Sequence, residues 1–171
     1  MTVKLIVAYD DKRGIGRRGK MPWHIPGESK WTSTVTRSAR SGRRNALIMG
    51  RHTYFSIPEK RRPLPDRINI VMTSRDCQIE SDVYLAGDFD KALHLTETID
   101  HVDDVFIFGG AQIYQQALNR RVADELIISE VKGDYGCDAF FPEIPAGYGL
   151  NSSATVTYGA FEVRHAHYVR R

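Results

Sequence analysis

Short apolar stretches alternate with segments of helical spacing along this chain, and that alternation limits the fold more than any other feature. Runs rich in aliphatic and β-branched residues, typical of buried strands, lie at 3–9, 45–49, 68–73, 83–86, 105–108 and 126–131. Between them, apolar residues recur at helical spacing in 28–40, 52–57, 89–98 and 110–119. Strand–helix–strand order predicts right-handed crossovers and a mostly parallel sheet covered on both faces.

The C-terminal segment has a different pattern. ATVTY at 154–158 and FEVRHAHYV at 161–169 have strand composition, and only Gly159 and Ala160 separate them, which predicts an antiparallel hairpin at the sheet edge. We therefore expect an α/β fold with a central, twisted, mostly parallel sheet of about eight strands, a C-terminal antiparallel hairpin and about four flanking helices. A length of 171 residues with 42% hydrophobic content suits one core, so a single domain over 1–171 is expected.

The composition excludes several classes of protein. The chain has no run of about 18 apolar residues, the length needed to cross a membrane. The N-terminus becomes charged too early for a signal peptide, so we expect a cytoplasmic protein. Cys77 and Cys137 show no CxxC spacing and are expected to be free thiols. His165 and His167 could share one face of a strand, but no third ligand lies nearby in the sequence, so we expect exposed histidines and no metal site.

Basic residues gather at 17–18, 37–44, 60–62 and 170–171, although the net charge is only +3. Aromatic residues do not alternate with these clusters, and no recognition-helix or RNA-binding signature accompanies them, which argues against nucleic acid as the primary ligand. Part of this charge can be solvated surface, and part suits a phosphorylated or carboxylated small molecule.

A glycine string, GIGRRG at 14–19, matches the GxGxxG pattern of dinucleotide-binding folds. That pattern requires a helix directly after the third glycine, whereas Pro22 and Pro26 follow here and block it. Residues 10–27 are therefore expected to form a long loop after the first strand. Such a loop in a compact domain is either an active-site lid or ordinary surface.

Four motifs occur in a fixed order: MPWHIPGE at 21–28, MGRHTYFSIPEKRRPLPDR at 49–67, FGGAQIY at 108–114 and DAFFPEIP at 138–145. Together they closely resemble the dihydrofolate reductase family, and the resemblance covers nearly the whole chain. It implies NADPH as cofactor and reduction of 7,8-dihydrofolate to tetrahydrofolate, by hydride transfer to pterin C6 and protonation at N5. We further expect antifolates to inhibit the protein and the protein to be a monomer.

The resemblance assigns catalysis to three residues. Glu28 would bond the amino group and ring N–H of the pterin and relay a proton through water, Trp23 would hold that water, and Met21 would close over the nicotinamide. From the residues alone, plainer roles stay open. Glu28 also favours the positive end of its own helix, and a Trp and a Met in a Pro-flanked loop are commonly packing residues.

For the cofactor, the resemblance places phosphate groups at two turns between a strand and a helix. Arg51 would bind the 2′-phosphate that distinguishes NADPH from NADH, and Thr53 would bind the pyrophosphate. Gly109 and Gly110, joined by a cis bond in the family, would let the backbone approach it, although without the flanking motif this pair is equally a tight turn. The other positions that match cofactor contacts are Ala8, Ile15, Gly16, Gly50, His52, Thr73, Ser74, Arg75, Ala111, Gln112 and Ile113.

For the substrate, the resemblance assigns Arg67 to the α-carboxylate of the glutamate tail, and Ile57 and Leu64 to the benzoyl part. Taken alone, an arginine two residues after a proline is more commonly a surface charge. Ser129 stands where many relatives have a threonine that bonds the catalytic carboxylate. The remaining substrate positions are Ile6, Val7, Thr32, Phe108 and Tyr114.

The chain departs from the family pattern beside the carboxylate. The family usually has an apolar residue directly after it and an aromatic residue one turn beyond, where this chain has Ser29 and Thr32. Loss of that aromatic wall predicts weaker contact with folate. Tyr9 is bulkier than the usual residue, and Gln112 stands where some relatives place a phosphate-binding arginine.

Two other functions stay open. One is the related pyrimidine reductase of riboflavin synthesis, which lacks the paired Trp23 and Glu28. The other is a non-catalytic nucleotide-binding protein that kept the cofactor turns while the folate pocket changed. Oxidation of NADPH that depends on folate would separate these from the reductase.

Overall fold

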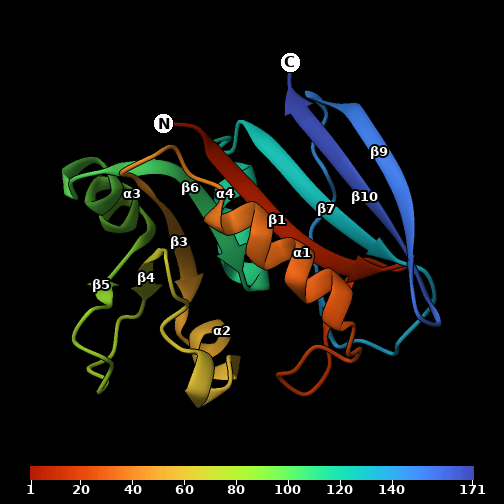
Figure 1. Ribbon diagram of the computed structural model, residues 1–171, viewed down its shortest axis with the longest axis horizontal. Coiled ribbons are helices and arrows are strands. Elements are labelled where there is room, and N and C mark those ends of the chain that lie inside the picture. The colour runs from red at the N-terminus through yellow and green to blue at the C-terminus, as the bar shows by residue number, and fades with distance from the viewer.

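The structure, a computed structural model, describes residues 1–171 and has a twisted eight-stranded sheet at its centre (Figure 1). The strands lie in the order β5–β4–β3–β6–β1–β7–β10–β9, and all neighbours are parallel except β7 with β10 and β10 with β9. This arrangement confirms the predicted α/β class and the antiparallel C-terminal hairpin. The strands are β1 (Val3–Asp10), β3 (Arg44–Gly50), β4 (Ile68–Met72), β5 (Tyr84–Ala86), β6 (Val102–Gly109), β7 (Glu125–Val131), β9 (Tyr148–Tyr158) and β10 (Phe161–Arg170).

Helices cover both faces of this sheet. On one face lie α1 (Pro26–Arg37), which crosses in front of β1 in Figure 1, and α2 (Arg51–Ser56), followed by the short 3-10 helix η1 (Glu59–Arg61). On the other face pack α3 (Phe89–Thr98) and α4 (Ala111–Asn119). Side chains alternate along β1, so Ile6 joins the apolar cluster near α1 and α2, whereas Val7 joins the larger core with α3 and α4.

The helix expected over 28–40 runs instead from Pro26 to Arg37. Pro26, predicted to block a helix, occupies the first helical turn, where a missing N–H costs nothing and the fixed φ of proline suits the helix. At the other end, the side-chain amide of Asn45 donates to the carbonyl oxygens of Thr36 and Ser38 at 3.0 and 3.2 Å. These bonds satisfy carbonyl groups that the helix leaves free, and the chain turns away there.

Two segments expected to be irregular contain strands. Within the loop of residues 10–27, β2 (Gly14–Gly16) pairs with β8 (Ala139–Phe140) in a separate two-stranded sheet. Strand β9 begins at Tyr148 instead of residue 154 and pairs with β10 to its end. The additional residues are mostly small or polar and lie at the exposed sheet edge, so they carry no alternation of apolar side chains.

Three further observations concern the classes considered from composition. No helix is both long and apolar enough to span a membrane. Cys77 and Cys137 are free thiols, as predicted. No group of three or more His, Cys, Asp or Glu side chains is arranged to hold a metal ion.

Asp10, at the end of β1, fixes the start of the 10–27 segment. Its side chain is 1% exposed and accepts hydrogen bonds from the backbone N–H groups of Lys12, Gly14 and Tyr135 at 2.9, 2.8 and 3.0 Å. Burial acts to raise the pKa of Asp10, but the N–H groups of Tyr135, Gly14 and Lys12 outweigh it and hold the pKa below its usual value. The charged carboxylate therefore ties this segment to the chain that follows β7.

Asp10→Ala is expected to lower the free energy of unfolding by about 3 kcal/mol at pH 7, because it leaves buried N–H groups without an acceptor. Since the folded-state pKa is depressed, this contribution is complete above about pH 4 and is lost as the pH falls through the folded-state pKa. Urea unfolding at pH 7 and pH 3 measures it, with Asp100→Ala, at an exposed aspartate, as the control. An equal cost at both pH values would contradict the role of the charge.

Candidate active site

A cavity of about 460 Å³ opens where β3, β4 and β6 end. The first turns of α2 and α4 close it on the other side. In α/β sheets, ligands bind outside the carboxyl ends of the strands. The cavity is lined by most of the residues that the sequence assigns to the cofactor, together with Met72: Gly50, Arg51, His52, Thr53, Thr73, Ser74, Arg75, Gly110, Ala111, Gln112 and Ile113.

The junction between β6 and α4 brings backbone to the cavity edge. The peptide bond between Gly109 and Gly110 is cis, as the resemblance implies. A Cβ atom at Gly110 would lie 3.3 Å from the Thr53 hydroxyl, closer than a side chain usually allows. The N–H groups of Ala111 and Gln112 precede the first hydrogen bonds of α4, which Ile113 and Tyr114 make to the Gly110 carbonyl. These free N–H groups can bind an anion.

Arg51 carries an unsatisfied donor at the same cavity. Its Nε atom is buried without a hydrogen-bond partner, and its guanidinium lies 5.5 Å from the centre of the Phe55 ring. His52 and Arg75 are exposed at the rim, where the Thr73 hydroxyl bonds the backbone N and O of Arg75, both at 3.1 Å. A buried donor without a partner is costly, so this end of the cavity suits a phosphate.

Glu28 provides a buried carboxylate in the first turn of α1. It is 4% exposed and accepts a hydrogen bond from the Thr32 hydroxyl at 2.8 Å. Burial and then the charge of Glu28 raise the pKa of both Tyr114 and Tyr158, so the carboxylate lies within electrostatic reach of both phenols. A buried carboxylate with a single hydroxyl partner has remaining oxygen lone pairs that a ligand with N–H donors can fill.

The segment before α1 presents two residues with different exposure. Trp23 is 6% exposed and packs edge-on against Tyr135 with ring centres 5.2 Å apart, while its indole Nε1 is buried without a partner. Met21 is 55% exposed. Ile15 packs against the main core, and the Gly16 carbonyl accepts the Asp138 N–H at 2.9 Å. This segment is therefore anchored through β2 and is not the plain loop that was predicted.

An apolar surface lies on the α1 and α2 side of the sheet. Ile57, Leu64 and Phe108 are half-buried there around a cluster that includes Ile6. Half-buried apolar side chains of this kind can pack against an aromatic ligand. Val7, predicted to contact substrate, points to the opposite face of β1 and lies in the main core, so only its backbone can border the site. Ala8 packs near Trp23.

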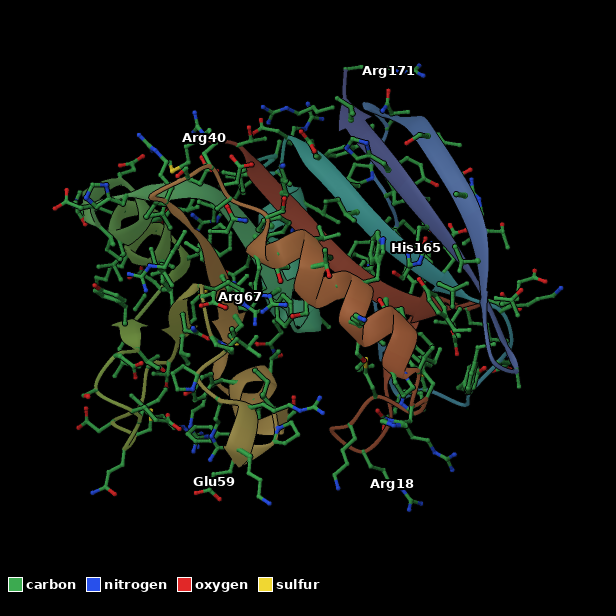
Figure 2. All side chains as sticks on the ribbon, viewed as in Figure 1. Arg18, Arg40, Glu59, Arg67, His165 and Arg171 are labelled. Atoms are coloured by element: carbon green, nitrogen blue, oxygen red, sulfur yellow. The ribbon has the colours of Figure 1, made fainter.

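Arg67 is a buried cation without an acidic partner. It is 6% exposed, and its guanidinium donates to the Thr36 hydroxyl and to the Pro65 carbonyl, both at 2.9 Å. The adjacent Asp66 pairs with Arg37 instead, at 3.4 Å. Burial and then the charge of Arg37 lower the pKa of Arg67 to about 10. Arg67 is therefore not the surface charge that its sequence context favours, and it lies beside α1 in Figure 2.

Two expectations were wrong: that the Ser129 hydroxyl bonds the carboxylate, and that His165 and His167 are exposed. The Ser129 hydroxyl bonds Nδ1 of His165 at 3.0 Å, and Thr32 is the residue that bonds Glu28. His165, expected to be exposed, is half-buried, because its ring stacks on that of Trp31 with centres 3.8 Å apart. His167, also expected to be exposed, is partly buried and contacts Glu125 at 3.0 Å.

Comparison with known proteins agrees with this geometry. The family model for dihydrofolate reductase matches residues 2–169. The chain belongs to the dihydrofolate reductase family. It is 38% identical to a dihydrofolate reductase of Drosophila melanogaster over 147 residues, covering 84% of this chain and 81% of that protein. It is 42% identical to a dihydrofolate reductase of Sus scrofa over 146 residues, covering 81% of this chain and 78% of that protein.

The two polar residues beside the carboxylate, Ser29 and Thr32, have different environments in this member of the dihydrofolate reductase family. Thr32 donates to Glu28, and Ser29 is exposed. The aromatic ring on this helix, Trp31, stacks on His165 instead.

Sequence reasoning missed Met72 at the cavity and Thr36 beside Arg67. Neither residue carries a motif, and only the helical spacing of Glu28, Thr32 and Thr36 could have indicated that Thr36 shares their face.

Proposed function

We propose that this protein is a dihydrofolate reductase that uses NADPH to reduce 7,8-dihydrofolate to tetrahydrofolate, with hydride transfer to pterin C6 and protonation at N5. Membership of the family supports the reaction class. The charges and unpartnered polar groups of the site support the particular substrate and cofactor.

The observation that carries the proposal is a pair of oppositely charged, unpaired side chains along α1. Glu28 is buried near the start of the helix, and Arg67 is buried against Thr36, eight residues further along. At 1.5 Å per residue, this spacing is about 12 Å. Dihydrofolate has a matching polarity: an amino group and ring N–H at the pterin end and carboxylates at the glutamate end. Half-buried Ile57 and Leu64 can contact the apolar benzoyl group between them.

The cofactor cavity fits a dinucleotide with an additional phosphate. The free N–H groups of Ala111 and Gln112 suit the pyrophosphate, and the unpartnered Nε of Arg51 suits the 2′-phosphate. NADPH, when bound, supplies the hydride. A side chain at residue 110 would crowd the Thr53 hydroxyl, with its Cβ atom at 3.3 Å, so glycine suits this edge of the cavity.

Proton delivery is assigned to Glu28 and Trp23. The Glu28 carboxylate would accept the amino group and ring N–H of the pterin and thereby fix its orientation. The buried Nε1 of Trp23 can donate to a water molecule, which would carry the proton toward pterin N5. Met21 would contribute by excluding solvent when it covers the nicotinamide.

The test follows NADPH oxidation optically with and without dihydrofolate. Oxidation that requires dihydrofolate supports the proposal. NADPH binding without turnover would support a non-catalytic nucleotide-binding protein, and turnover only with a ribosylamino-pyrimidine would support the reductase of riboflavin synthesis.

Arg51→Ala is expected to weaken NADPH binding by about 10- to 100-fold while NADH binding changes little, because a charge-assisted hydrogen bond contributes about 1.5–3 kcal/mol. Nucleotide fluorescence titration measures both dissociation constants. Arg18→Ala, at an exposed arginine outside the cavity, is the control. An equal loss for the two nucleotides would remove Arg51 from the 2′-phosphate.

A further inference from the structure

The C-terminal hairpin contacts α1 on both sides of Glu28. Tyr158, at the end of β9, packs against Gly27 so closely that a Cβ atom there would lie 2.4 Å from the Tyr158 ring. His165 of β10 stacks on Trp31 with ring centres 3.8 Å apart and planes 26° apart. Gly27 and Trp31 precede and follow Glu28, so the hairpin holds the turn that carries the carboxylate. Figure 2 shows His165 beside α1, on the side away from Arg67.

A chain of hydrogen bonds joins the hairpin to the sheet beneath this turn. The Tyr158 hydroxyl bonds Nε2 of His165 at 2.8 Å, and Nδ1 of His165 bonds the Ser129 hydroxyl at 3.0 Å. Burial lowers the pKa of His165 and thereby favours the neutral ring. A neutral imidazole has one donor and one acceptor, so its tautomer sets the direction of both hydroxyl protons. With the proton on Nδ1, Tyr158 donates to Nε2 and the Ser129 proton stays free for another acceptor.

Apolar packing also holds the start of α1, because Ile25 is 3% exposed and packs with Trp23, Val131 and Val163. Its N-cap residue, Ile25, has no side chain that can bond the free N–H groups of the first turn, and no ion pair involves Glu28. The carboxylate itself is bonded by Thr32 of the same helix, which does not fix the helix relative to the sheet. The contacts that Tyr158 and His165 make on either side of Glu28 therefore add to this packing in fixing its position.

We propose that His165 is a positioning residue for Glu28, which, together with Tyr158 and Ser129, fixes the turn of α1 that carries the carboxylate. The inference rests on the proposed function. His165 acts through Trp31 and Ser129 and does not contact the reacting atoms. The groups that face it are Trp31 from α1, Ser129 from β7 and Tyr158 from β9.

The test compares His165→Leu, His165→Gln, His165→Asn and Tyr158→Phe in steady-state kinetics with dihydrofolate over a range of pH. His165→Leu is expected to lower kcat/KM by about ten-fold or more and to shift the pH at which activity declines, because small misplacements of a catalytic group are costly. Glutamine can replace Nε2 and asparagine Nδ1, so each should restore part of the loss. Tyr158→Phe should cause a smaller loss, and NADPH affinity should stay unchanged throughout.

His167→Leu is the matched control, since it lies on the same strand and the same face but contacts Glu125. The inference is overturned if His165→Leu, folded by its thermal transition, keeps the kcat/KM and pH profile of His167→Leu. If the leucine variant does not fold, unchanged kinetics of His165→Gln and Tyr158→Phe at every pH overturn it equally. Wild type and Glu28→Gln are assayed in the same series: absent wild-type turnover counts against the proposed function, whereas normal turnover with insensitive His165 variants counts against this inference alone.

Discussion

Glu28→Gln is expected to lower kcat for dihydrofolate reduction at pH 7 by about 10²- to 10⁴-fold, the range for removing a general acid–base group. Glutamine has nearly the same shape and keeps an oxygen that can accept from Thr32, which bonds Glu28 at 2.8 Å. It cannot exchange a proton and cannot accept both pterin N–H donors. The rate of NADPH oxidation measures the effect, and circular dichroism checks that the variant folds.

The same substitution at Glu59, an exposed glutamate in η1, provides the control and should leave kcat unchanged. NADPH affinity should be equal in both variants, since residue 28 does not line the cofactor cavity. A Glu28→Gln variant that retains wild-type kcat at pH 7 would exclude Glu28 from proton delivery.

Arg67→Leu is expected to raise KM for dihydrofolate by about 100-fold with a smaller effect on kcat, because losing one partner of a buried charge pair costs about 2–5 kcal/mol. Arg67 is buried with only a hydroxyl and a carbonyl as partners, so its guanidinium is available to a carboxylate. The effect concerns the glutamate tail, which is remote from the reacting carbon. Steady-state kinetics with varied dihydrofolate measures it.

A substrate without the glutamate, dihydropteroate, separates tail binding from general damage to the site. Its KM should be the same for wild type and Arg67→Leu. Arg18→Leu, at an exposed arginine remote from Arg67 in Figure 2, should change neither substrate. Equal losses with both substrates would show that Arg67 supports the site in another way.

The buried strands and α3 could be predicted because each has a local signal. The central runs are continuously apolar, and α3 begins after Asp88, whose side chain accepts the Lys91 N–H at 2.8 Å as an N-cap. The start of α1 could not be placed, since Pro26 permits either a loop or a first helical turn. The first half of β9 was missed because pairing with β10, rather than its own composition, makes it a strand.

Part of the candidate site could be predicted from the sequence, and part could not. The cofactor residues follow two strand-to-helix turns and could be assembled from motifs, and they line one cavity. The environment of Glu28 could not, because Ser129 and His165 come from strands more than 100 residues later and bond each other, while Thr32 bonds the carboxylate. Strand alternation alone does not say which face of β1 carries the site, so the burial of the Val7 side chain in the main core could not be predicted.

The place of β1 in the sheet has a consequence for how the chain acquires its structure during synthesis. Strand β1 is made first, yet its two neighbours are β6 and β7, with Val3 opposite Val105 and Lys4 opposite Glu125. The middle of the sheet therefore cannot close until β7 has left the ribosome. Such long-range pairing folds slowly, and β1 stays exposed to chaperones until then.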